Sequence, residues 1–136
     1  MRIWVRHFTG QPRVARFQIR FIHFTLKSLS GTPVTRLEKL QGMLQDSPDD
    51  VFLNYALAME FVSAARKDDA LSAFARVLTL DAQHSAAWFQ QAQLQASLGQ
   101  FDAARQSATH GVAAAKAQND QHAAEEIAGF LESIPG

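Results

Sequence analysis

Two consecutive stretches of this chain, residues 51–84 and 85–118, share one pattern of residues with a period of 34. In the first stretch the pattern comprises Leu57, Ala58, Phe61, Ala70, Phe74, Val77, Leu80 and Asp81. In the second stretch the residues on the same grid are Trp88, Ala92, Gly99, Phe101, Ala104 and Ala108. This spacing predicts a helix, a turn and a second helix in each stretch. Repeats of about 20 to 50 residues fold as stacks of similar units that bury each other's apolar faces.

The spacing resembles the tetratricopeptide repeat, a family of helical hairpins. The resemblance implies an all-α fold, an α–α superhelix of antiparallel helical hairpins with about six helices, which serves as a binding scaffold. Gly99 lies where the family places a glycine between paired helices, and Ala65 is the equivalent residue of the first repeat. The Gly99 site suits the left-handed conformation, and Ala65 departs from the pattern: if it adopts that conformation, its Cβ atom should cost about 1 kcal/mol.

Helices are predicted at residues 35–47, 51–64, 68–80, 85–98, 102–116 and 120–133. The first resembles the second helix of a repeat whose first helix is missing, and Thr35 with Glu38 fits a capping box. Asp68 and Asp102 are expected to cap the second helices of the two repeats. The amphipathic last helix is expected to cover one open end of the stack.

Residues 1–33 carry six of the thirteen basic residues and no acid, whereas residues 34–136 carry thirteen acids, a net charge of −6. We expect a poorly ordered, basic and aromatic-rich arm at 1–33, followed by a helical repeat domain at 34–134. Alternating apolar residues around 16–26 favour a strand within the arm. Three interpretations of the arm stay open: a mis-assigned translation start, weak contact with membrane or nucleic acid, and a targeting segment.

By resemblance, the function of this fold comes from a concave groove lined by the first helix of each repeat. The groove residues implied for this chain are Phe52, Tyr55, Met59, Val62, Phe89, Gln93 and Ser97. Tyr55 and Phe89 occupy equivalent positions, so one expectation is an aromatic ladder along the groove. The alternative is that some of these side chains pack against the arm, the first helix or the last helix.

Family members that bind the acidic C-termini of heat-shock chaperones place Lys and Asn in the groove. Here the corresponding positions are Tyr55, Met59, Ser63, Phe89, Gln93 and Ser97. None of these side chains can form an ion pair with a carboxylate, so that partner is not expected.

Three residues of the second repeat depart from the expected apolar pattern. Gln91 and Gln95 occupy positions that usually carry apolar core residues in the family. We favour packing of their aliphatic stems with the amide groups in solvent, over a polar interface or a bound water. Gly111 is expected to permit close approach of a neighbouring helix.

The sequence shows no constellation of residues typical of catalysis. It contains no cysteine and no glycine-rich phosphate loop, and His84, His110 and His122 fall on different predicted elements. We therefore expect a non-enzymatic cytoplasmic protein without cofactor or metal, which binds a peptide or a partner helix in its groove. The alternative is contact with nucleic acid or a membrane surface through the arm, although the acidic repeats disfavour nucleic acid.

Overall fold

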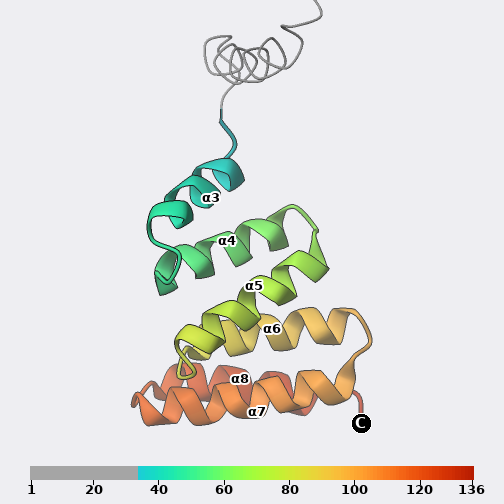
Figure 1. Cartoon of the computed structure of the whole chain (residues 1–136). Coiled ribbons are helices and arrows are strands. Elements are labelled where there is room, and N and C mark those ends of the chain that lie inside the picture. Colours follow the sequence, from blue (N-terminus) through green and yellow to red (C-terminus); the bar gives the residue numbers. More distant parts are fainter. Residues whose placement is uncertain (1–33) are drawn as a thin grey trace, which may run out of the picture. The chain divides into compact units, whose positions relative to one another are not determined.

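The computed structural model describes residues 34–136, and the arm at 1–33 with its predicted strand lies outside the described residues. Residues Arg36–Gly136 form one compact unit. The helices of this unit, labelled as in Figure 1, are α3 (Arg36–Asp46), α4 (Val51–Ser63), α5 (Lys67–Leu80), α6 (Ser85–Ser97), α7 (Phe101–Ala117) and α8 (Gln121–Ser133). Each predicted helix is confirmed to within one residue at each end.

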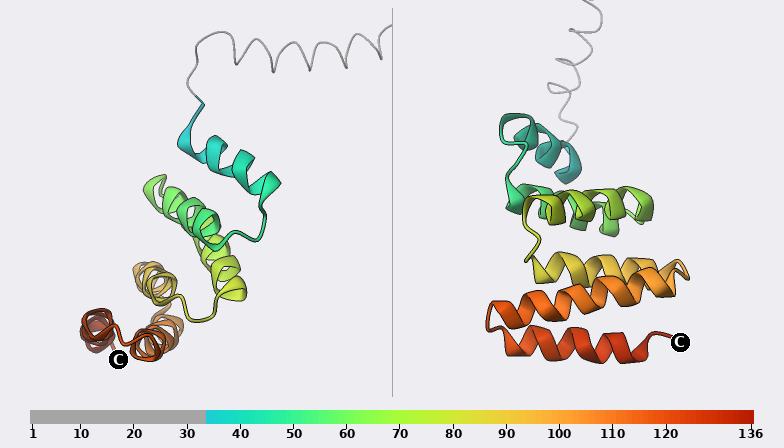
Figure 2. Two further views of the ribbon diagram at one scale, coloured as in Figure 1. Left: turned by 90° about the vertical axis from the view of Figure 1, so that its left-hand side faces the viewer. Right: turned by 60° about the horizontal axis from the view of Figure 1, so that its bottom comes forward.

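Each helix packs against the next one along the chain, from α3 to α8, and α6 also touches α8. Short turns join α4 to α5 and α6 to α7, so each pair forms an antiparallel hairpin (Figures 1 and 2). The expected all-α stack of hairpins is confirmed. This arrangement follows from the sequence because each amphipathic helix can bury its apolar face only against its neighbours.

Three inter-helix turns share the same left-handed residue geometry. Ala65 has φ = 57°, Gly99 has φ = 77° and Asn119 has φ = 59°. The amide of the residue after each one donates to the carbonyl oxygen five residues earlier, at 2.9 Å in every case, which is the Schellman motif. The left-handed conformation expected at Gly99 is confirmed, and Ala65 adopts it as well despite its Cβ atom.

Side-chain caps begin three of the helices. Asp50, His84 and Asp120 accept hydrogen bonds from the backbone amides three residues further on, at 2.9, 3.1 and 3.0 Å. The predicted caps at Asp68 and Asp102 are wrong, because α5 and α7 begin one residue earlier and have no side-chain cap. Both carboxylates lie instead in the first helical turn, where they still face the positive end of the helix dipole.

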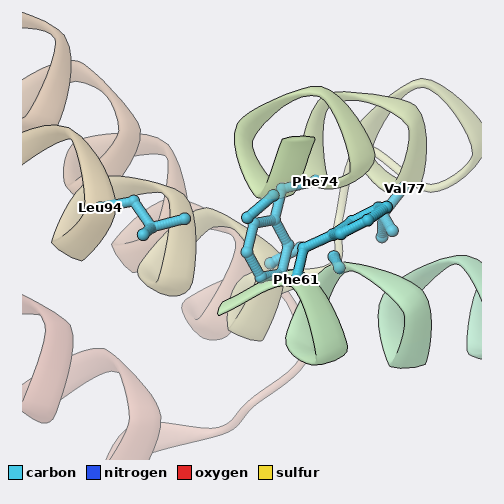
Figure 3. Close-up of a cluster of buried hydrophobic side chains, with 7 residues drawn as sticks. Phe61, Phe74, Val77 and Leu94 are labelled. Carbon is cyan, nitrogen blue, oxygen red and sulfur yellow. The ribbon is translucent and has the colours of Figure 1, made fainter. Parts of the chain in front are cut away.

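The first hairpin and α6 share one apolar core. It is made of Ala58, Phe61, Ala70, Phe74, Val77, Ala87 and Leu94. Figure 3 shows Leu94 extending from α6 toward the aromatic side chains of the first hairpin. The two repeats therefore bury apolar surface together rather than separately.

A second core cluster joins the second hairpin to α8, through Ala92, Ala108 and Ile127. On the 34-residue grid, Gly111 takes the place of Val77, and it is buried. A Cβ atom added to Gly111 would lie 3.1 Å from Cβ of Trp88 and 3.3 Å from Cδ1 of Ile127. The predicted close approach is confirmed: α6 and α8 come within contact distance of the α7 backbone at this point.

Candidate protein-binding surface

Four of the predicted groove residues form a stripe along α4, which we call the α4 stripe: Phe52, Tyr55, Met59 and Val62. Their spacing of three, four and three residues places them on one face of the helix. Phe52 is 77% exposed, and the other three are half-buried. An aromatic side chain that is left in water costs free energy, and its burial by a partner would recover that free energy.

Tyr55 is held in place by two aromatic neighbours. Its ring centroid lies 5.9 Å from that of Phe74 and 4.8 Å from that of His84, with which it stacks. His84 is itself fixed, because its Nδ1 caps α6 by accepting from the amide of Ala87. Burial raises the pKa of Tyr55 above its ordinary value of 10.0 by desolvating the phenolate form.

Met59 and Val62 pack against the core of the first hairpin, together with Tyr55. Because each remains half-buried, one side of each side chain contributes to the core and the other side to the surface. Phe52 does not belong to this core cluster. The α4 stripe therefore has a rigid base and one exposed aromatic residue at its N-terminal end.

Phe89, the predicted counterpart of Tyr55 on α6, packs against the last helix. Its ring meets that of Phe130 on α8 edge-on, with the centroids 5.5 Å apart. Among the ring contacts within residues 34–136, none joins Tyr55 to Phe89. The two rings do not form the expected ladder, and the alternative of packing against the last helix holds for Phe89.

Gln93 and Ser97 are exposed on α6. The Ser97 hydroxyl donates to the carbonyl oxygen of Leu94 at 2.7 Å and accepts from the Lys67 ammonium at 3.1 Å. A cation therefore lies beside one of the predicted residues, and sequence reasoning missed it. The repeat pattern gave no signal for Lys67, since the equivalent residue of the second repeat is Phe101.

The glutamines of α6 form a polar network with α7 rather than extending into solvent. Gln91 Nε2 donates to the Ser107 hydroxyl at 3.1 Å, and that hydroxyl donates to Gln95 Oε1 at 2.7 Å. Ser107 is buried, and both glutamines are half-buried. The favoured expectation of solvent-exposed amides is wrong, because Ser107 supplies both a donor and an acceptor between the helices.

The three histidines of residues 34–136 lie on separate elements. His110 stacks on Trp88 with centroids 4.6 Å apart, His84 caps α6, and His122 is exposed on α8. Within the described residues, no group of three or more His, Asp or Glu side chains could hold a metal ion. In the same part of the chain, every helix is too short or too polar to cross a bilayer.

Several solved structures are similar to the structure of this chain. A protein from Bordetella parapertussis, solved in solution, is 27% identical over 75% of this chain and 89% of its own length, with a TM-score of 0.66. A tetratricopeptide repeat domain protein from Salinibacter ruber is 24% identical over 65% of this chain and 90% of its own, with a TM-score of 0.62.

A third similar structure is PcrH, crystallised in complex with the chaperone binding region of PopD. It is 19% identical over 92% of this chain and 94% of its own length, with a TM-score of 0.70. No protein-family model matches the sequence, and no curated protein matches it. The chain therefore has the tetratricopeptide repeat fold, a stack of antiparallel helical hairpins.

Proposed function

We propose that the protein binds a segment of another protein along the α4 stripe and the exposed residues Gln93 and Ser97 of α6. The observation that carries this proposal is Phe52, which is 77% exposed although it begins a row of apolar residues. Aromatic residues at the edge of a rigid apolar surface are typical anchors of protein interfaces. The similarity to PcrH, solved with a bound region of PopD, supports a protein ligand for this fold.

The surface favours a partner with apolar side chains at helical spacing. Met59 is unbranched and adapts its shape to different side chains, whereas Tyr55 is fixed by its ring contacts. A flexible residue beside a fixed aromatic ring suits a partner helix that presents apolar residues three and four positions apart. Beyond the stripe, Gln93 and the pair of Lys67 and Ser97 offer polar contacts at the rim.

Selection from a phage-displayed random peptide library, with the full-length protein as bait, tests this proposal. Fluorescence anisotropy then measures the affinity of each selected peptide for the wild type and for Phe52→Asp. We expect at least about a tenfold loss of affinity, because the substitution removes an aromatic anchor. An acidic side chain in the first turn of α4 is compatible with the helix dipole, so the variant should remain folded.

Ala75→Asp is the matched control, because it places the same charge at an exposed position of α5. Selected peptides should bind this control like the wild type. Peptides that bind Phe52→Asp normally, or that lose affinity for both variants equally, would contradict the α4 stripe as the binding site.

The single tyrosine of the chain offers an independent readout. Burial already raises the pKa of Tyr55, and a peptide across the α4 stripe would desolvate the phenolate further. The ultraviolet titration of the phenol should therefore move to higher pH when a selected, tyrosine-free peptide is bound. An unchanged titration would show that the peptide binds elsewhere.

A further inference from the structure

The repeat period places α3 at the position of the second helix of a repeat. It ends at Asp46, which lies 34 residues before Leu80 at the end of α5. On this grid Leu40 and Met43 of α3 correspond to Phe74 and Val77 of α5. Phe74 and Val77 are both fully buried, whereas Met43 is 54% exposed.

The difference between Val77 and Met43 has a structural cause. α5 lies between α4, the first helix of its own repeat, and α6 of the next one. Among the helices of residues 34–136, α3 packs mainly against α4, which belongs to the following repeat. No helix of residues 34–136 therefore covers the face of α3 that would meet its own first helix.

This open face carries a line of three exposed residues, Lys39, Met43 and Asp46, which we call the α3 outer face. Their spacing of four and then three residues places them along one side of the helix, with the two charges about 10 Å apart. Within the described part of the chain, neither Lys39 nor Asp46 takes part in an ion pair. Gly42 lies beside Met43, and a Cβ atom there would meet nothing within 4 Å.

We propose that the α3 outer face pairs with the same face of a second copy of the chain, with the two α3 helices antiparallel. The charges are arranged for this pairing, since Lys39 and Asp46 lie almost equally far from Met43 on opposite sides. A two-fold axis beside Met43 brings each Lys39 to the Asp46 of the other copy and the two Met43 side chains together. The small Gly42 allows the helices to approach closely.

The antiparallel direction also matches the fold. In the complete hairpins, each second helix is covered by a first helix that runs antiparallel to it (Figure 1). A second α3 across a two-fold axis supplies a helix in that direction. The other end of the stack offers no comparable apolar surface, because α8 presents Glu125 and Glu126 to solvent.

The expected association is weak. One helix of 11 residues per copy buries less than the roughly 1,200 Å² of a small stable interface, so dissociation constants between micromolar and millimolar follow. This self-association uses α3 and leaves the proposed partner surface on α4 and α6 free, so the two proposals can fail independently.

Sedimentation equilibrium of the full-length protein, from about 10 μM to about 1 mM, tests the pairing. We expect a monomer–dimer equilibrium that Met43→Asp shifts strongly toward monomer. Lys39→Asp and Asp46→Lys should each raise the dissociation constant at least about tenfold, since each creates two like-charge contacts per dimer. The double variant, with both charges exchanged, should return to the wild-type value.

Gln41→Glu changes the charge of α3 at an exposed position away from the outer face, and it should leave the equilibrium unchanged. Circular dichroism and the denaturation midpoint of each variant establish that it is folded. A protein that stays monomeric over the whole range would overturn the proposal. Assemblies that grow beyond dimers, or single charge variants that the exchange does not rescue, would overturn it as well.

Discussion

At the scale of single residues, Ala65 and Gly99 close equivalent turns at different conformational cost. Both are left-handed, and both precede the amide that completes the Schellman motif. Glycine has no Cβ atom to clash in this conformation, whereas alanine does. The first hairpin therefore contains a local strain that the second does not.

Ala65→Gly should raise the free energy of unfolding by about 0.5–1 kcal/mol, because the relief of the Cβ clash exceeds the greater entropy of unfolded glycine. Chemical denaturation measures the change. The neighbouring substitution Ala64→Gly is the control: Ala64 has φ = −83°, so it should lower the stability instead. A lowered or unchanged midpoint for Ala65→Gly would contradict the strain at this turn.

These turns were predictable because a left-handed position recurs with the period and depends only on local backbone. The position of Lys67 could not be predicted in this way, because its contact with Ser97 joins two side chains that are 30 residues apart in sequence. The same reason explains the error at Gln91 and Gln95. Their partner Ser107 is not one of the residues that define the repeat pattern. Only the packing of α7 on α6 places Ser107 between the two glutamines.

At the scale of helices, the second repeat has small residues at core positions where the first repeat has large ones. Ala108 and Gly111 of α7 take the positions of Phe74 and Val77 of α5. The space is filled by Ile127, which is 1% exposed and comes from α8 rather than from the hairpin itself. The sequence predicted that α8 covers the stack, but not which side chain would fill this position.

Gly111→Ala should destabilise the protein by about 1–3 kcal/mol. The new Cβ would meet Trp88 Cβ, which is fixed to its own backbone, and the resulting overpacking outweighs the better helix propensity of alanine. Gly129→Ala on α8 is the control, because a Cβ there meets nothing within 4 Å. It should stabilise by up to about 1 kcal/mol. Equal changes of the melting temperature in the two variants would show that helix propensity alone determines the effect of both substitutions.

At the scale of the whole molecule, Leu94 connects the two repeats. It belongs to α6 of the second hairpin, yet it is buried in one cluster with Phe61 and Phe74 of the first (Figure 3). In stacked repeats, such contacts between neighbours supply much of the stability that no hairpin has alone. The fold predicts that loss of this side chain weakens both hairpins together.

Native-state hydrogen exchange of Leu94→Ala tests this coupling most directly. The truncation should cost about 2–4 kcal/mol, and the slowest amides of α4 and α5 should lose the same opening free energy as those of α6 and α7. Leu98→Ala is the control, because Leu98 is 38% exposed: it should lower the opening free energy of the slowest amides in either hairpin by about 1 kcal/mol or less. A loss confined to α6 and α7, with α4 and α5 fully protected, would contradict coupling of the two repeats through the core cluster around Leu94.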